Sequence, residues 1–128
     1  MIGKILGGRY QIESSLGEGG MARVFKARDL KLNRIVAVKV LHDHLTGNQD
    51  FVRRFRREAQ AVAKFSHPSI VSLYDVGEED NIYYIVMECL QGKTLKELIK
   101  QEGKLSAEDA VEIACQVCDA LVHAHRQN

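Results

Sequence analysis

The stretch of sequence that decides the fold reads Gly17-Glu18-Gly19-Gly20-Met21-Ala22-Arg23-Val24. Three of its first four residues are glycines, which lack a Cβ atom and let backbone amides approach the oxygens of a phosphate group. The residues that follow, 24–28, alternate as a β-strand does and do not show the period of a helix. The stretch therefore predicts a glycine-rich turn between two antiparallel strands.

Two other phosphate-binding motifs are imitated in this chain, and we reject both. The glycines fit the dinucleotide-binding pattern G-x-G-x-x-G/A, with Ala22 in the third place, but that motif requires a helix directly after the turn. Residues 92–94 (Gly-Lys-Thr) imitate the end of a P-loop, which requires a glycine five residues earlier, where Met87 stands.

A lysine and a glutamate extend the candidate site. Lys39 lies in the apolar segment 35–41, where the two-residue period of a strand puts it on the same face as Ala37. Glu58 follows Phe55 at helical spacing, so we expect it on the apolar stripe of a helix, where a carboxylate needs a partner such as Lys39. By themselves these residues also fit an edge-strand lysine or a plain core salt bridge. Together with the glycine turn they favour a phosphate site.

The remaining pattern predicts an α+β fold. Strands are expected between residues 10 and 41, a helix over 48–65, and two further strands at 70–74 and 82–87, separated by the polar segment 77–81. The expected architecture is a five-stranded antiparallel sheet with one packed helix, followed by two helices of a second lobe.

Those two helices follow Gly92, and Thr94 and Ser106 are placed to cap their first turns. The last helix, about 106–126, carries apolar residues on more than one stripe, as does a helix enclosed on most sides. Because too little chain remains to enclose it, we expect the sequence to be cut inside a larger domain.

Composition sets outer limits on function. The 128 residues are 45% hydrophobic and 27% charged, which suits one globular core, and 18 basic against 17 acidic residues give no general attraction to nucleic acid. There is no membrane segment or signal peptide, so we expect a cytoplasmic location. Cys115 and Cys118 form one C-x-x-C without a second pair, so we expect small buried thiols and no metal site. We interpret His42 and His44 as surface or helix-packing residues.

Taken in order, these features resemble the beginning of a protein kinase domain, specifically that of a bacterial Hanks-type serine/threonine kinase. The resemblance extends over nearly the whole chain and rests on Arg9-Tyr10, the loop Gly19-Gly20-Met21-Ala22, Val36-Ala37-Val38-Lys39, Arg56-Arg57-Glu58-Ala59, His67-Pro68-Ser69-Ile70-Val71 and Ile85-Val86-Met87-Glu88. It implies a small lobe over residues 1–91, with glycine-rich loop, helix and hinge, and an incomplete start of the large lobe over 92–128.

The resemblance implies an ATP site. The glycine loop would cover the phosphates, Lys39 would hold the α- and β-phosphates, and Glu58 would orient Lys39. Lys39 and Glu58 are therefore the catalytic candidates. Met87 matches the gatekeeper, and the Glu88 carbonyl and Leu90 amide would bond the adenine edge at the hinge. The implied nucleotide-binding residues are Leu16, Gly17, Glu18, Gly19, Gly20, Met21, Ala22, Val24, Ala37, Lys39, Met87, Glu88, Cys89 and Leu90.

The chain also departs from the family pattern. Ala22 replaces the third glycine, as in bacterial members, and the sequence has no H-R-D catalytic loop, D-F-G segment or A-P-E segment. Mg²⁺ is expected to take its ligands from those missing parts. We therefore expect these 128 residues to be inactive alone, whereas the parent would transfer the γ-phosphate of ATP to protein serine or threonine.

The alternative function is a noncatalytic nucleotide-sensing or interaction module. The family resemblance also implies a homodimer through the back of the small lobe, with contacts at Arg9, Leu32 and Asp75, for which surface salt bridges and an exposed leucine are the ordinary interpretation. The parent could be anchored in a membrane by a segment not present here.

Overall fold

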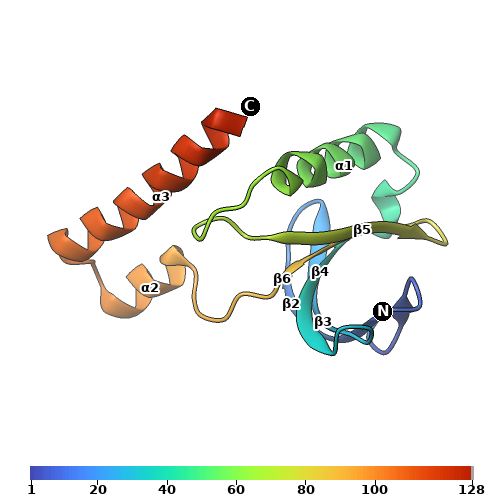
Figure 1. Ribbon diagram of the computed structural model, residues 1–128. Helices are drawn as coiled ribbons and strands as arrows, with labels where there is room; N and C mark the ends of the chain where they lie inside the picture. The colour runs from blue at the N-terminus through green and yellow to red at the C-terminus, as the bar shows by residue number, and fades with distance from the viewer. Residues whose placement is uncertain (128) are drawn as a thin grey trace. The chain divides into compact units, whose positions relative to one another are not determined.

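The computed structural model describes residues 1–127 and divides into two compact units, one of residues 1–64 and 72–89 and one of residues 65–71 and those from 90 onward. The elements in chain order are β1 (Ile5–Leu6), β2 (Tyr10–Glu18), β3 (Ala22–Asp29), β4 (Arg34–Leu41), the 3-10 helix η1 (Asp43–Leu45), α1 (Gln49–Ala63), β5 (Leu73–Glu79), β6 (Ile82–Glu88), α2 (Leu95–Glu102) and α3 (Ala107–Gln127) (Figure 1). This confirms the predicted α+β fold. The predicted lobe boundary at residue 91 stays a prediction.

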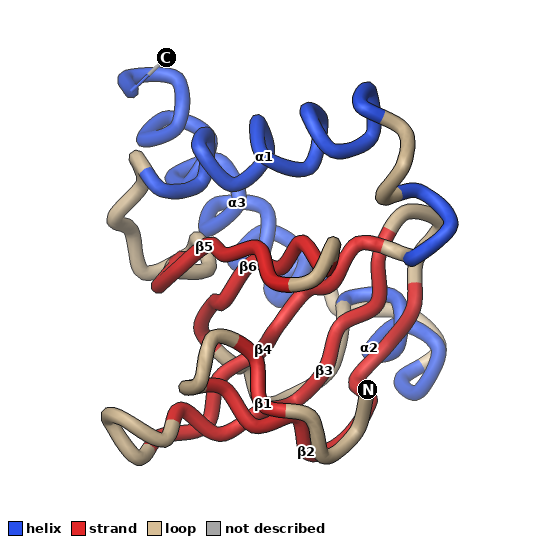
Figure 2. Tube along the Cα trace, turned by 90° about the vertical axis from the view of Figure 1, so that its right-hand side faces the viewer, coloured by secondary structure: helices blue, strands red, loops and turns tan. Residues whose placement is uncertain are grey.

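All strands of the first unit join one antiparallel sheet in the order β1-β2-β3-β4-β6-β5. The sheet has one strand more than the sequence predicted, because the two-residue β1 pairs Ile5 with Gln11 and Leu6 with Tyr10. Strand β2 has register shifts between Ile12 and Ser14 and between Ser15 and Gly17. Helix α1 lies along one side of the sheet (Figure 2).

The two faces of this sheet carry separate apolar clusters. One contains Val36, Val38 and Val40 of β4, together with Leu6, Tyr10, Ile12, Phe25, Ala27, Tyr84 and Val86. The other joins Leu41 to α1 through Val52, Phe55 and Ala59, and includes Ala22 and Ile85. Alternate residues of β4 therefore serve opposite faces, as the period of a strand requires.

The fifth strand differs from its predicted position. It runs over Leu73–Glu79 instead of 70–74, and the turn to β6 consists of Asp80 and Asn81, both at positive φ (49° and 64°). Asx residues tolerate this conformation, which matches the twist of a tight hairpin. Gly77, expected in the linker, lies inside the strand opposite Tyr84, where a Cβ would collide with the Tyr84 ring.

In the second unit both predicted N-caps are present. Thr94 Oγ1 accepts from the Glu97 amide at 3.1 Å, and Ser106 Oγ accepts from the Asp109 amide at 3.1 Å. No described residue of α3 is buried, and Val111 is 61% exposed.

The expectation of buried thiols is wrong for both cysteines of α3. Cys115 and Cys118 are exposed because α3 lacks a covering layer among residues 1–127. Within the same described part of the chain, no helix has the length and apolar character needed to span a bilayer.

Candidate functional site

The structure brings the predicted lysine and glutamate into direct contact. Lys39 Nζ lies 2.6 Å from Glu58 Oε1, and Lys39 stands on β4 opposite Val24 of β3 and Ile85 of β6. Hydrogen bonds between charged groups are the strong ones, so this contact fixes the lysine against α1.

The expected burial of Glu58 is wrong. Its side chain is 44% exposed and that of Lys39 24% exposed. On α1 the residues that enter the core are Val52, Phe55 and Ala59, and Glu58 lies beside that stripe, reaching Lys39 around its edge. The pair is therefore a solvent-accessible link and not a core salt bridge.

The glycine stretch forms the end of β2, the turn and the start of β3. Gly19 donates its amide to the Ala22 carbonyl at 2.9 Å, which closes the turn over Gly20 and Met21. The turn leads directly into β3, and β3 runs beside Lys39 because Val24 is the register partner of Lys39. Exposed glycines in this position leave backbone amides open to an anion.

The other candidate residues fall into two groups. In the first unit, Val24 pairs with Lys39 and Ala37 pairs with Met87, so the register brings these residues together. The Glu88 amide donates to the Ser72 carbonyl at 2.8 Å, and the Ser72 amide donates to the Glu88 carboxylate at 3.2 Å. Cys89 follows, partly buried, whereas Leu16 and Leu90 are exposed. Leu90 belongs to the second unit, so its place beside the others stays a prediction.

Sequence reasoning missed a buried ion pair at the far end of the same sheet. Arg9 holds both carboxylate oxygens of Asp29, Nε to Oδ1 and Nη2 to Oδ2, each at 2.8 Å, and Asp29 is completely buried. Asp29 also accepts from the amides of Lys31 and Leu32 at 3.0 and 3.2 Å. The hydrogen bonds from Arg9 are the largest cause of a lowered pKa, and the bonds from the two amides add to their effect. Together they hold the pKa of the Asp29 carboxyl at about 2, below its ordinary 3.8. No local pattern signals a contact between residues 20 positions apart.

Two of the three residues named for a dimer contact are engaged within the chain. Arg9 binds Asp29, and Asp75 accepts from the Tyr10 hydroxyl at 2.7 Å. Burial, followed by this hydrogen bond, raises the pKa of Tyr10. Leu32 is 54% exposed. Pairing through this surface stays a prediction.

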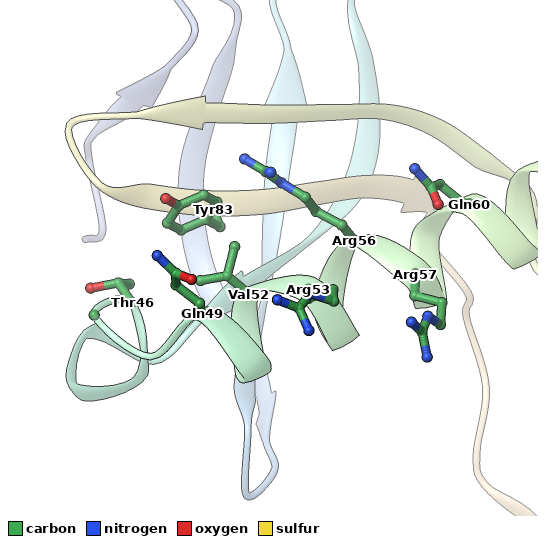
Figure 3. A pocket seen from close by; sticks show the side chains of 9 residues that line it. Thr46, Gln49, Val52, Arg53, Arg56, Arg57, Gln60 and Tyr83 are labelled. Atoms are coloured by element: carbon green, nitrogen blue, oxygen red, sulfur yellow. The ribbon is translucent and has the colours of Figure 1, made fainter.

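A separate hollow of about 630 Å³ is lined by Arg53, Arg56 and Arg57 of α1 and by Tyr83 of β6 (Figure 3). Arg56 reaches toward the β5–β6 hairpin, where it binds Glu78 at 3.2 Å, while Arg53 lies 3.7 Å from Asp50. Lys39 and Glu58 do not line this hollow. All three arginines are exposed.

Comparison with known proteins defines the class. Residues 10–128 match the sequence model of the protein kinase domain, and the chain belongs to the protein kinase family. It is 51% identical over 126 residues to serine/threonine-protein kinase PrkC of Bacillus subtilis, covering 98% of this chain and 19% of PrkC. It is 44% identical over 125 residues to serine/threonine-protein kinase PknB of Mycobacterium leprae, covering 94% of this chain and 20% of PknB.

Solved structures agree with this assignment. A crystal structure of the Mycobacterium tuberculosis PknI kinase domain superposes with a TM-score of 0.84 at 27% identity, covering 100% of this chain and 51% of that one. The resemblance to bacterial serine/threonine kinases is therefore confirmed. The chain spans about a fifth of the length of the curated relatives named above.

Proposed function

We propose that this chain is the ATP-binding portion of a serine/threonine protein kinase, whose whole domain transfers the γ-phosphate of ATP to protein serine or threonine. The observation that carries the proposal is the 2.6 Å contact between Lys39 and Glu58 beside the glycine turn, in a chain of the protein kinase family. A glycine turn with a positioned ammonium group is suited to binding the phosphates of a nucleotide.

Each group has a defined task in this proposal. The amides of Gly20 and Met21 in the turn donate to phosphate oxygens, Lys39 places its positive charge against them, and Glu58 limits where the lysine can lie. Val24, Ala37 and Met87, on three adjacent strands, supply apolar surface for the base. The backbone at Glu88–Leu90 would bond the adenine edge.

The residues present fit the phosphates of ATP but not a complete magnesium site. Among residues 1–127 no group of three or more histidine, cysteine, aspartate or glutamate side chains is arranged to hold a metal ion. When bound with ATP, Mg²⁺ neutralises phosphate charge. We propose that it takes protein ligands from outside the described residues.

Calorimetric titration of Mg-ATP into this chain and into Lys39→Met tests nucleotide binding. We expect the variant to lose binding, while Lys31→Met, which changes an exposed lysine in the turn between β3 and β4, retains it. Equal affinity in the chain and in Lys39→Met would contradict the assigned role of Lys39. Absence of binding in all three proteins would remove the nucleotide site from this chain.

We propose further that the chain alone does not transfer phosphate, because its sequence holds neither the H-R-D loop nor the D-F-G segment. Incorporation of labelled γ-phosphate into a protein substrate above the level of the Lys39→Met control would disprove this.

A noncatalytic interaction module is the second candidate. The observation that favours it is the pair of exposed leucines, Leu30 and Leu32, between β3 and β4. Sedimentation of Leu32→Asp tests this surface without removing the buried Arg9–Asp29 pair. An unchanged association constant would exclude Leu32 from any dimer contact.

A further inference from the structure

His42 holds the tip of the glycine turn at two points. Its backbone amide donates to the Met21 carbonyl at 3.0 Å, and its ring Nε2 lies 2.8 Å from the Gly19 carbonyl oxygen. A carbonyl oxygen can only accept, so Nε2 carries a hydrogen and donates it. The His42 side chain is only 13% exposed, which limits the other positions that its ring can take.

The His42 ring lies on the sheet face opposite Lys39. Along β4, Val38 and Val40 belong to the apolar cluster that contains Phe25, while Lys39 between them points to the other face. His42 comes two residues after Val40, and with Val40 and Phe25 it lines a hollow of about 440 Å³.

This position determines where the next amide points. The Gly19 carbonyl and the Gly20 amide belong to one planar trans peptide unit, so their bonds point in opposite directions. Because the carbonyl is drawn toward His42, the Gly20 N–H is turned away from the His42 ring, and Lys39 lies on the opposite face of the sheet from that ring. That is the face where the phosphates of a bound nucleotide would lie.

We propose that His42 is a positioning residue for the nucleotide: its ring anchors the Gly19 carbonyl and thereby aims the Gly20 amide at a phosphate. The phosphate-binding half of this inference rests on the proposed function, whereas the anchoring half does not. His42 acts through the backbone of the turn and needs no contact with the nucleotide.

The groups around the ring provide a matched control. Glu18 Oε1 lies 3.9 Å from Nε2 and also accepts from Arg23 at 3.3 Å. His44 stacks on His42 with ring centroids 5.4 Å apart, and within residues 1–127 its ring has no hydrogen bond to the turn. Replacing His44 therefore removes the stacking without removing the anchor.

The test compares His42→Leu, His42→Gln and His44→Leu with the unchanged chain. Amide hydrogen exchange, measured by NMR without nucleotide, reports on the Gly19 amide, which bonds to Ala22 inside the turn. We expect exchange at Gly19 to rise about three- to tenfold in His42→Leu, which corresponds to one lost hydrogen bond. Glutamine can donate from a similar place, so His42→Gln should stay within about twofold, as should His44→Leu.

The second readout is the Kd for Mg-ATP. We expect it to rise about three- to tenfold in His42→Leu only. Unchanged exchange in His42→Leu, or an equal rise in His44→Leu, would overturn the anchor. Faster exchange with unchanged Kd would overturn the positioning role. If the unchanged chain binds no ATP, the proposed function and the positioning role fail together, and exchange at Gly19 still decides the anchor.

Discussion

Removing Arg9 tests how much the buried Asp29 carboxylate depends on its partner. In Arg9→Met the two side-chain bonds of 2.8 Å are lost, while Asp29 stays completely buried. Leaving a buried charge without its partner costs about 3–5 kcal/mol. Here the amides of Lys31 and Leu32 remain, and Arg34 Nε, 3.7 Å from Asp29, can move closer. We therefore expect the free energy of unfolding to fall by about 2–3 kcal/mol.

Urea denaturation at pH 7, followed by far-ultraviolet circular dichroism, measures this change. With a slope of about 1–3 kcal/mol per molar urea, the midpoint should fall by roughly 0.7–3 M. Arg28→Met is the control, because among residues 1–127 the Arg28 side chain bonds only Asn33, in an exposed contact, and its loss should change stability by less than about 0.5 kcal/mol. If Arg9→Met unfolds at the same midpoint as the control, the pair contributes nothing measurable and the reasoning is refuted.

The pH dependence of the unchanged chain gives a second check. The pKa of Asp29 is about 2 in the folded state against an ordinary 3.8, so the folded state favours the ionised carboxyl. The stability that this provides is fully present above the unfolded pKa and is lost as the pH falls from about 4 to about 2. If stability does not decline in that interval, the assignment of the lowered pKa to this carboxyl is wrong.

Three further predictions concern packing and exposure. Phe55→Ala should lower stability by about 3–5 kcal/mol in urea titrations, because Phe55 is buried between α1 and the sheet; a loss below about 1 kcal/mol would contradict that packing. Gly77→Ala should cost about 1–3 kcal/mol, since the new methyl group meets the Tyr84 ring, and Gly47→Ala, in open space, serves as its control. Ellman's reagent should modify Cys115 and Cys118 rapidly and the partly buried Cys89 more slowly; uniform rates for all three thiols would contradict the exposure seen here.

The elements that could be predicted are those with a clear local period. The alternation between Tyr10 and Leu41 located three strands, and the spacing of Phe55 and Ala59 located α1. Local pattern failed at β5, because Gly77 and its polar neighbours read as a linker, whereas pairing with β6 makes them part of the strand, with Gly77 opposite Tyr84. Strand β1 was missed because two residues are too few to show a period.

The sequence predicted that Lys39 and Glu58 face each other, but it did not predict how exposed their side chains are. Helical period puts Glu58 near the buried stripe, but the reach of its side chain around the edge depends on where β4 lies. The Arg9–Asp29 pair and the bond from His42 to Gly19 join residues 20 and 23 positions apart. Such contacts depend on sheet register, which a single sequence does not reveal.

Because β1 has only two residues, part of β2 forms an open edge of the sheet, at which another copy of the protein could pair. Beyond Ile12, strand β2 is an outer strand whose backbone groups have no partner strand on one side within residues 1–127. An uninterrupted outer strand invites another chain to add on, and a bulge hinders this by twisting the strand away. Both register shifts of β2 lie in this unpaired half. The irregular backbone that leads into the glycine turn thus also guards the molecule against edge-to-edge aggregation.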